Sequence, residues 1–429
     1  MPPPGSFPKR LSISNAQSEQ LRALVSAVVG PNPFYTKKFE RSGTYKIRHL
    51  GDLADNVPFT TKTEIVEDQL ANPPYGTNLT YPLDRYSRCS QTSGTTGTPL
   101  RWLDTPESWD WMLRNWLTIY AAAEVTRSDV IYFPFSFGPF LGFWTAFEAG
   151  TRLGALCLPG GGLSSAARLR AILDHNATVL CATPSYAMRL AEVAAEEKID
   201  LTASPVKLII LAGEAGGSVP ATRARLEDLW PGARVFDHHG MTEVGPVTFE
   251  CPAKPGRLHV IETSYIAEII NPNTGVAALP DETGELVLTN LGRIGSPLIR
   301  YRTGDLVKSS HEHFCDCGRQ DLALDGGIIG RVDDMIVVRG VNIYPTAVEE
   351  VVRGIEGVVE YSVNISNESA LTEIAVSVEF AAMIDAPEQV RRLETAFERA
   401  FSLRVPVIVA EPGSLPRAEA KAKRWIRST

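Results

Sequence analysis

Between residues 130 and 211 the chain repeats a pattern that few folds can accommodate. Short apolar runs alternate with longer stretches of helical periodicity. Strands that alternate with helices predict a largely parallel sheet with helices on its faces. We therefore expect an α/β layer with strands at 130–133, 155–158, 178–182 and 207–211 and helices at 164–175 and 186–196.

The flanking segments differ from this layer. Residues 1–85 are expected to be irregular, with one amphipathic helix near 18–29. Short strands at 265–270 and 284–289, with the turn sequence NPNTG at 271–275, indicate an antiparallel or barrel-like subdomain. The last hundred residues predict a compact α+β unit with helices at 346–354 and 387–401 and strands at 358–364, 372–379 and 405–410.

Length supports more than one domain, because 429 residues exceed the size at which a single core keeps growing. We predict an N-terminal domain at 1–330 and a small C-terminal domain at 331–429. The fold class is α/β, with a large parallel-sheet domain, a small barrel-like subdomain and a small mobile α+β domain.

Charge and hydropathy exclude several classes of partner. The formal net charge of −8 argues against nucleic acid and anionic membrane surfaces, which both favour a basic face. No apolar run reaches the roughly 18 residues of a membrane span, and the first residues lack the apolar core of a signal peptide. We expect a cytoplasmic protein without a membrane partner. Six cysteines are too few for a disulfide scaffold in a chain this long.

A loop of glycines and hydroxyls, SQTSGTTGTP, occupies residues 90–99. Backbone N–H groups and hydroxyls in such a loop can close around phosphate oxygens. The loop is not a Walker sequence, because no Lys-Ser or Lys-Thr follows its last glycine. A solvated connection is the alternative interpretation.

A second polar segment, FDHHGMTEVGP, lies at 236–246. Thr242 could donate to a phosphate, and His239 could present a flat ring to a purine. Glu243 could hold Mg²⁺, which binds one or two carboxylates together with phosphate oxygens. The alternative is a polar turn with a capping threonine and two solvated or core-packed histidines.

Three further segments carry polar groups of the same kind. Asp305, in YRTGDL at 301–306, suits two vicinal ribose hydroxyls. In GRVDDMIVVRGVNIYP at 330–345, Arg331 can reach a phosphate or ribose, Asp333 marks a hinge, and Gly340 would allow close approach of a thin ligand. The tail at 413–424 is typical, by composition alone, of a basic solvated terminus.

These five segments, in this order, resemble the adenylate-forming superfamily of acyl-CoA synthetases and adenylation domains. They are most similar to the phenylacetate–CoA ligase family. That similarity extends to PFTTK at 58–62, RGVNIYP at 339–345 and GSLPRAEAKAKR at 413–424, and it covers residues 35–429.

The resemblance implies a role for each matching residue. Ser93, Gly94, Thr95, Thr96 and Gly97 would orient the β- and γ-phosphates of ATP. Gly213 and Glu214 would line the adenine and acyl pockets, and Asp237, His238 and His239 would border the adenine. Thr242 would contact the α-phosphate, Glu243 the magnesium ion, and Asp305 with Arg331 the ribose. Asp333 would be the hinge, Gly340 would border a CoA tunnel, and Lys421 would reach the acyl carboxylate and bridging oxygen.

The acid pocket is expected to have aromatic walls, because the run 132–140 is rich in rings and the family uses this segment near its aryl acid. Core packing of half these rings is the alternative. The predicted acid-binding residues are Tyr132, Phe135, Ser136, Gly138, Ala212, Gly213, Gly245 and Pro246.

The sequence departs from the family pattern in three places. Thr98 stands where the phosphate loop usually has lysine, and Ala420 replaces the glycine before the catalytic lysine. His238-His239 replaces an apolar residue followed by tyrosine, which puts a donor near the acyl or adenine pocket.

Cys251, His259, Cys315 and Cys317 form a candidate zinc site. Structural zinc takes four nitrogen or sulfur ligands in a tetrahedron. The spacing is not that of a common zinc finger, and some phenylacetate–CoA ligase relatives carry zinc at similar positions. His311 and His313 are competing ligands, and three reduced cysteines are the alternative.

The function that the resemblance implies is ATP-dependent activation of an aryl or arylacetic acid to an acyl-adenylate, followed by transfer to CoA. The catalytic residues would be Lys421, Thr242 and Glu243, with ATP, Mg²⁺ and structural Zn²⁺ as cofactors. Transfer to an amine or a carrier-protein thiol is the enzymatic alternative. A catalytically inactive nucleotide- or acyl-binding protein is the alternative outside enzymes. A homodimer stays open.

Overall fold

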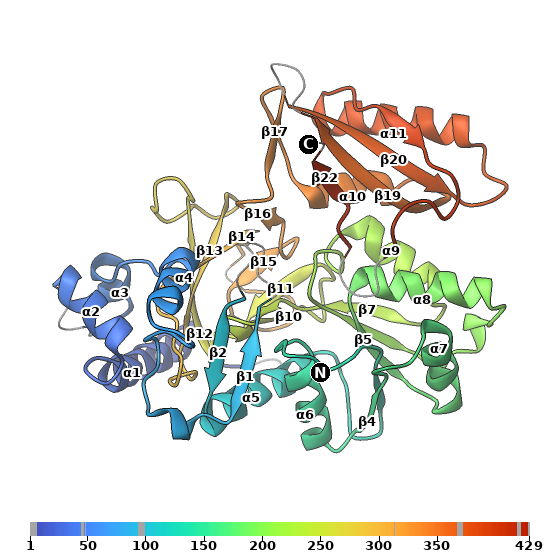
Figure 1. The fold of residues 1–429 in the computed structure, drawn as a ribbon. Helices are drawn as coiled ribbons and strands as arrows, with labels where there is room; N and C mark the ends of the chain where they lie inside the picture. Colours follow the sequence, from blue (N-terminus) through green and yellow to red (C-terminus); the bar gives the residue numbers. More distant parts are fainter. Residues whose placement is uncertain are drawn as a thin grey trace. The chain divides into compact units, whose positions relative to one another are not determined.

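The computed structural model describes residues 7–43, 47, 49–92, 99–312, 314–366, 372–417 and 422–427. Contacts divide the chain into two compact units, 1–161 with 237–327, and 162–236 with 328–429. Figure 1 shows the second unit's two stretches in green and in orange to red. The predicted boundary at residue 330 stays a prediction, because a division by contacts need not be a division into folding domains.

The start of the first unit is helical, so the expectation of an irregular segment with one helix is wrong. Local capping explains the short helices: Asn32 accepts a hydrogen bond from the Tyr35 N–H, and Thr61 with Glu64 forms a capping box. Such caps act within one turn and leave little periodicity to detect. The helices are α1 (Arg10–Val28), α2 (Pro33–Ser42), α3 (Leu50–Asn56), α4 (Lys62–Ala71) and the 3₁₀ turn η1 (Leu83–Arg85).

Two kinds of strand pairing complete the first unit. β3 (Val130–Phe133) and β4 (Leu156–Pro159) pair in parallel. Between the other named strands that the structure describes in this unit, the pairings are antiparallel, which confirms the predicted antiparallel subdomain. The other elements of this unit are β1 (Arg88–Gln91), β2 (Arg101–Asp104), α5 (Pro106–Ala122), α6 (Trp144–Leu153), β8 (Gly240–Met241), β9 (Gly245–Pro246), β10 (Thr248–Glu250), β11 (Arg257–Val260), β12 (Tyr265–Ile270), β13 (Thr283–Asn290), β14 (Tyr301–Lys308) and β15 (Ala323–Asp325).

The second unit begins with alternating helices and strands. β5 (Val179–Ala182) and β6 (Leu208–Leu211) pair in parallel, and every residue of both strands is buried. Continuous apolar runs suit parallel strands, because helices cover both faces of such a sheet. The same part contains α7 (Ser165–Asp174), α8 (Pro184–Glu196), the 3₁₀ turn η2 (Leu201–Ala203), α9 (Pro220–Leu229) and β7 (Arg234–Asp237), which neighbours β6.

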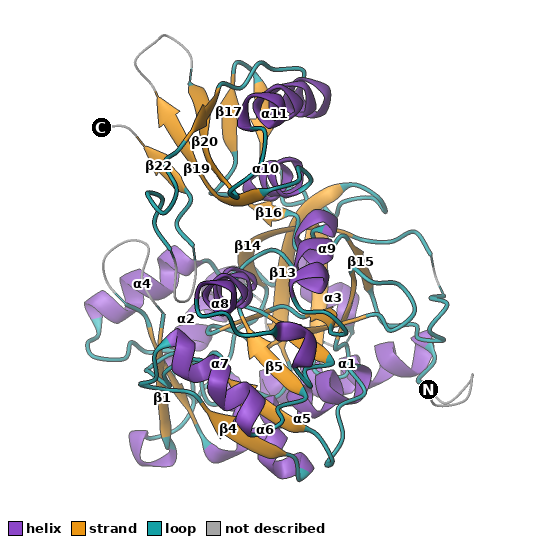
Figure 2. Cartoon of the chain, turned by 90° about the vertical axis from the view of Figure 1, so that its right-hand side faces the viewer, coloured by secondary structure: helices purple, strands orange, loops and turns teal. Residues whose placement is uncertain are grey.

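The end of the chain forms the predicted α+β arrangement. Its sheet has the order β21-β20-β19-β22. Figure 2 shows α10 and α11 on one face of this sheet, where Leu393 and Phe397 of α11 are fully buried. The elements are β16 (Gly330–Arg331), β17 (Ile336–Val338), β18 (Val341–Ile343), α10 (Pro345–Arg353), β19 (Val358–Ser366), β20 (Glu373–Phe380), α11 (Ala386–Phe401), β21 (Val407–Val409) and β22 (Trp425–Arg427). The fold class expected from the sequence is thereby confirmed. Among the described residues, no helix is long and apolar enough to cross a membrane.

An ion pair lies in the interior of the first unit. Asp104, the last residue of β2, accepts from Arg293 Nε at 2.6 Å and Nη2 at 2.7 Å, and both side chains are fully buried. The third guanidinium nitrogen donates to the backbone oxygens of Thr242 at 2.8 Å and Glu243 at 2.7 Å. A single buried cation therefore joins β2 to the turn between β8 and β9.

Replacing Arg293 with methionine should lower the free energy of unfolding by about 3–5 kcal/mol, because a buried carboxylate and two carbonyls lose their partner. Urea denaturation measures the change. Arg170→Gln is the control, since Arg170 pairs with Glu197 at 2.8 Å on an exposed surface and should change stability by less than about 1 kcal/mol. Equal effects of the two variants would contradict a supporting role for the buried pair.

Candidate active site

The turn that carries Thr242 and Glu243 is held by its backbone. It connects β8 to β9, which pair through Gly240–Pro246 and Met241–Gly245. The hydroxyl of Tyr265 donates to the Val244 oxygen at 2.8 Å, in addition to the two bonds from Arg293. Gly245 has φ +92°, and a Cβ there would lie 3.1 Å from the Met112 sulfur, so glycine is required. The turn is therefore fixed independently of its side chains.

The carboxylate of Glu243 lies near an amine. Its Oε1 is 3.7 Å from Nζ of Lys62, the first residue of α4, and the Glu243 side chain is largely buried. A carboxylate held on a fixed turn is a suitable protein ligand for Mg²⁺, which takes its other ligands from phosphate and water. An amine at this distance could neutralise phosphate charge next to such an ion.

His239 and Asp305 lie together in the structure. Nε2 of His239 is 3.2 Å from Oδ2 of Asp305 on β14. The backbone N–H of His239 donates to the Thr248 hydroxyl at 2.8 Å, and that of Asp305 to the Thr303 hydroxyl at 3.0 Å. Two residues predicted to bind one nucleoside thus face each other within the first unit.

His238 is the most isolated polar side chain of this segment. Only 5% of it is exposed, its ring meets Trp116 edge-on at 4.5 Å, and neither ring nitrogen makes a hydrogen bond among the described residues. Burial lowers the pKa of His238 to about 3, and His239 adds to the shift. The backbone of His239 opposes the shift only in part. The ring is therefore neutral at physiological pH, with one donor and one acceptor unused.

The aromatic run continues from His238 through neighbouring rings. Trp116 lies 6.2 Å from Phe143, which stacks on Phe135 at 4.7 Å. Of the predicted acid-binding residues, Tyr132 is buried, Phe135 is half-buried and Ser136 is exposed. The oxygen of Gly138 accepts from the Trp144 indole at 2.9 Å. The rings therefore divide between core packing and a less buried edge.

The predicted residues of the second unit have other partners. Glu214 accepts hydrogen bonds from the backbone of Ser185 at 2.7 Å and of Ala422 at 3.1 Å. Arg331 and Asp333 form an ion pair at 3.0 Å that is partly exposed. Three further predicted residues lie in this unit: the Ala212 N–H donates to the Ala182 oxygen at 3.2 Å, Gly213 has φ +94°, and Gly340 has φ +86° at the tip of the β17–β18 hairpin. The binding and hinge roles predicted for all these residues stay predictions.

Several predicted residues lie outside the described part of the chain. They are the phosphate-loop residues Ser93, Gly94, Thr95, Thr96, Gly97 and Thr98, the tail residues Ala420 and Lys421, and His313.

The predicted zinc ligands come together within the first unit. The ligand atoms of Cys251, His259, Cys315 and Cys317 all lie within 4.8 Å of one another, and all four residues are buried. The Cys251 and Cys315 sulfurs are 3.4 Å apart, and the Cys317 sulfur is 3.4 Å from Nε2 of His259. Three thiols and one imidazole at such separations fit a tetrahedral zinc site.

Neighbouring groups orient these ligands. Nδ1 of His259 lies 3.3 Å from the Asp321 oxygen, which leaves Nε2 to face the sulfurs. The guanidinium of Arg257 donates to the Cys315 sulfur at 3.5 Å. Burial raises the pKa of the Cys315 thiol, but His259, the Cys317 backbone and Arg257 outweigh burial and lower it. His311 instead pairs with Asp281 at 2.8 Å and is not part of the cluster.

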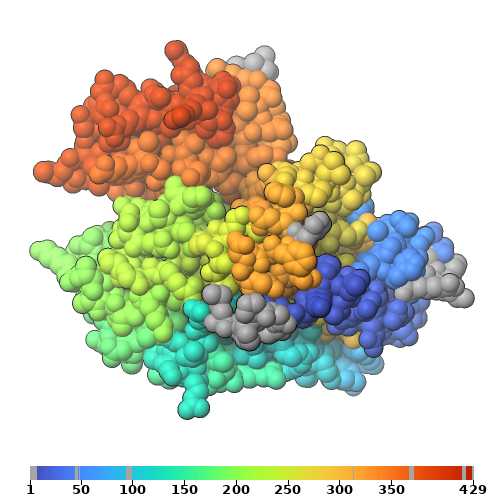
Figure 3. All heavy atoms as spheres, turned by 180° about the vertical axis from the view of Figure 1, so that it is seen from behind, coloured from blue at the N-terminus to red at the C-terminus, as the bar shows by residue number. Residues whose placement is uncertain are grey.

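The segment that supplies Cys315 and Cys317 packs beside the N-terminal helix, and Figure 3 shows its orange surface next to dark-blue α1. Arg10 donates to the Gln320 oxygen at 3.3 Å, and Arg319 lies 4.2 Å from the Phe7 ring. Non-local contacts thus hold the second half of the cluster in place.

Sequence reasoning missed three residues of this region. The sequence indicated Lys62 only as the last residue of the PFTTK motif at 58–62, with no role of its own. Arg293 and Trp116 sit in segments without polar patterning, and only the folded chain brings them to the turn and to His238.

Comparisons with known proteins agree with this geometry. The family described as AMP-binding enzyme matches residues 91–292, and the AMP-binding enzyme C-terminal domain matches residues 340–428. A phenylacetate-coenzyme A ligase from Thermus thermophilus is 29% identical over 96% of this chain and 95% of that protein. The Escherichia coli phenylacetate-coenzyme A ligase is 29% identical over 95% and 93%.

A solved structure extends the likeness to the whole chain. The crystal structure of 2-hydroxyisobutyryl-CoA ligase in the postadenylation state, in complex with 2-HIB-AMP, has a TM-score of 0.93 at 26% identity, covering 100% of this chain and 94% of that chain. The two matched segments and the full-length relatives confirm the resemblance that the motifs indicated, and the chain belongs to the AMP-binding enzyme family.

Proposed function

We propose that this protein is an AMP-forming acid–CoA ligase that activates an aryl or arylacetic acid. The observation that carries the proposal is the rigid turn with Thr242 and Glu243 in the same unit as the facing pair His239 and Asp305. Its full-length similarity to phenylacetate-coenzyme A ligases supports the acid class and the acceptor.

In the first step a carboxylate oxygen attacks the α-phosphorus of ATP, and pyrophosphate leaves. The Thr242 hydroxyl donates to the α-phosphate, and Asp305 accepts from the ribose hydroxyls. Lys421 stabilises the charge that develops on the attacking and bridging oxygens. These groups act by placement and by charge compensation, which need no covalent bond to the protein.

Glu243 would hold Mg²⁺, with phosphate oxygens as further ligands. When bound, the ion offsets negative charge on the phosphates. Lys62 adds a second positive charge beside the same carboxylate.

In the second step the thiol of CoA attacks the acyl carbon, and AMP leaves with the oxygen that bonded to phosphorus. We propose that Asp333 is the hinge for a turn of the C-terminal segment, and that Gly340 borders the path of the thiol. An open hairpin tip at Gly340 supports this, because no atom of the described residues lies within 4 Å of a Cβ built there.

The functional test is pyrophosphate release across a panel of aryl, arylacetic and short aliphatic acids, with and without CoA. We expect release with an aryl or arylacetic acid and, when CoA is added, equimolar AMP and thioester. Pyrophosphate release without CoA-dependent AMP would make an amine or a carrier-protein thiol the acceptor. Absence of release with every acid would contradict adenylation and favour an inactive binding protein.

We further propose that His238 selects ring acids that carry a hydroxyl or amino substituent. Both nitrogens of this buried imidazole have already lost their hydrogen bonds to water. A ligand hydroxyl or amino group that bonds to them therefore restores hydrogen bonds without a further desolvation cost to the imidazole. Wild-type kcat/KM should favour hydroxylated over unsubstituted ring acids by about tenfold or more, and His238→Leu should abolish that preference. An unchanged ratio in His238→Leu would place the imidazole outside the acid site.

For the Cys₃His cluster we propose one structural zinc ion per chain, held by Cys251, His259, Cys315 and Cys317. Elemental analysis should find one zinc per chain after purification without added metal, and Cys317→Ser should lose the metal and lower the melting temperature. His311→Ala is the matched control and should keep the metal, since His311 pairs with Asp281. A folded wild-type protein without metal would refute the site.

A further inference from the structure

One side of β10 binds the main chain of residues 237–239, which are predicted to border the adenine. The Thr248 hydroxyl accepts from the His239 N–H at 2.8 Å, and the His239 oxygen accepts from the N–H groups of Val247 at 2.9 Å and Thr248 at 3.1 Å. Further along the strand, the Glu250 carboxylate accepts from the Asp237 N–H at 3.3 Å. Thr248 and Glu250 are both buried. β10 and the residue before it therefore fix the main chain of 237–239.

The middle residue of β10 packs on the Cys₃His cluster. Successive side chains of a strand point to opposite faces, which puts Phe249 on the other side from its two neighbours. Its ring stacks on the imidazole of His259, its partner on β11, with ring centroids 5.5 Å apart. Cys251 follows β10 directly. The hairpin of β10 and β11 thus holds His239 and also carries two of the four predicted zinc ligands.

The other two ligands follow β14, the strand that carries Asp305. Beyond the last residue of β14, the Ser310 N–H donates to the Ala323 oxygen at 2.9 Å, and Ala323 lies on β15, which pairs with β11. After the two cysteines, the Arg319 guanidinium lies 4.5 Å from the Phe249 ring. The two halves of the cluster therefore come from the two segments that hold the facing pair His239 and Asp305.

A bound zinc ion would cross-link these two segments. It would take two ligands from the β10–β11 hairpin and two from the loop after β14. Pairing of β11 with β15 already holds the segments near each other, and the ion would add four bonds at one point. Segments joined in this way lose relative freedom, so the pair of His239 and Asp305 is pre-organised for a ligand.

We propose that the zinc site is coupled to the nucleotide site: the ion fixes the β10–β11 hairpin, and Thr248 passes this order to the main chain at His239. The inference rests on the proposed function, in which His239 and Asp305 border the nucleoside and the cluster holds one zinc ion. Coupling between two sites is reciprocal. The factor by which zinc raises the affinity for AMP must equal the factor by which AMP raises the affinity for zinc.

The test measures zinc affinity with and without AMP. Wild-type protein would be titrated against a chelator of known zinc affinity, first without nucleotide and then with saturating AMP. We expect AMP to raise the affinity for zinc about fivefold or more, the size of an ordinary coupling. Calorimetry should give the same factor for AMP binding to zinc-loaded and zinc-depleted protein, with circular dichroism to show that the depleted protein is folded.

Thr248→Val tests the route of the coupling in zinc-loaded protein. Valine keeps the shape of threonine, leaves all four ligands in place and removes the acceptor of the His239 N–H. The variant should hold one zinc ion per chain, with a zinc affinity in the absence of AMP within about twofold of wild type. The factor by which AMP raises that affinity should fall at least about threefold, because a buried N–H loses its partner.

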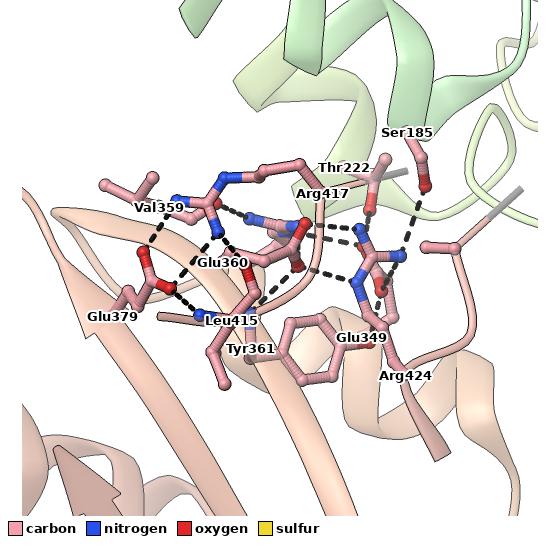
Figure 4. Close-up of polar contacts among 12 residues, drawn as sticks. Ser185, Thr222, Glu349, Val359, Glu360, Tyr361, Glu379, Leu415, Arg417 and Arg424 are labelled. Carbon is pink, nitrogen blue, oxygen red and sulfur yellow. Dashed lines mark hydrogen bonds and ion pairs between the residues drawn. The ribbon is translucent and has the colours of Figure 1, made fainter. Parts of the chain in front are cut away.

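Thr222→Val is the matched control. Thr222 is also a fully buried threonine, and its hydroxyl donates to Glu349 at 3.3 Å (Figure 4). It lies in the second unit, whereas all four ligands lie in the first. Thr222→Val should keep the wild-type factor.

A zinc affinity that AMP leaves unchanged in wild type, or an AMP effect that is the same in Thr248→Val and Thr222→Val, would overturn the coupling. Pyrophosphate release by the same wild-type protein would then show that the proposed function stands. Protein that binds no zinc would overturn the zinc site and the coupling with it. Protein that releases no pyrophosphate with any acid and binds no AMP would overturn the proposed function itself.

Discussion

The buried pair of Asp104 and Arg293 is the interaction on which the candidate site depends. Asp104 ends β2, the strand that follows the phosphate-loop motif. Arg293 binds the Asp104 carboxylate and also donates to the backbone oxygens of Thr242 and Glu243. Ion pairs removed from water are costly to form, and the geometry here compensates with a bidentate contact and two further acceptors for the guanidinium. The turn of Thr242 and Glu243 is therefore held by a charge pair that solvent does not reach.

Each unit carries its own part of the proposed chemistry. In the first unit, fixed backbone holds Glu243, and His239 faces Asp305. In the second, Glu214, in the loop after β6, binds the backbone N–H groups of Ser185 and Ala422. The two parts differ in kind: the turn is held through its backbone carbonyls by a buried guanidinium, whereas the tail is held by side chains of the 184–222 segment.

Sequence reasoning succeeded where the signal is local or where chemistry limits the residue types. Strands 130–133 and 265–270 were predicted with the bounds that the structure has, because apolar runs in buried strands are continuous or alternate cleanly. The Cys₃His cluster was predicted from ligand type, although its halves are 56 residues apart along the chain from His259 to Cys315. Of the helices before residue 72, only one was expected, near 18–29, where α1 ends; the shorter ones were missed because capping acts over single turns. Arg293, Trp116 and Ala422 could not have been found, since their roles come from partners far away in the sequence.

The central claim is that the acid is activated as an adenylate, and its most direct test follows an oxygen atom. The acid would be labelled with oxygen-18 in its carboxylate and allowed to react with ATP and CoA. Mass spectrometry would then measure the oxygen-18 content of AMP, pyrophosphate and any inorganic phosphate. Attack of the carboxylate on the α-phosphorus predicts one labelled oxygen in the phosphate of AMP and none in pyrophosphate. Label in inorganic phosphate, together with ADP, would show activation as an acyl phosphate and would contradict this account.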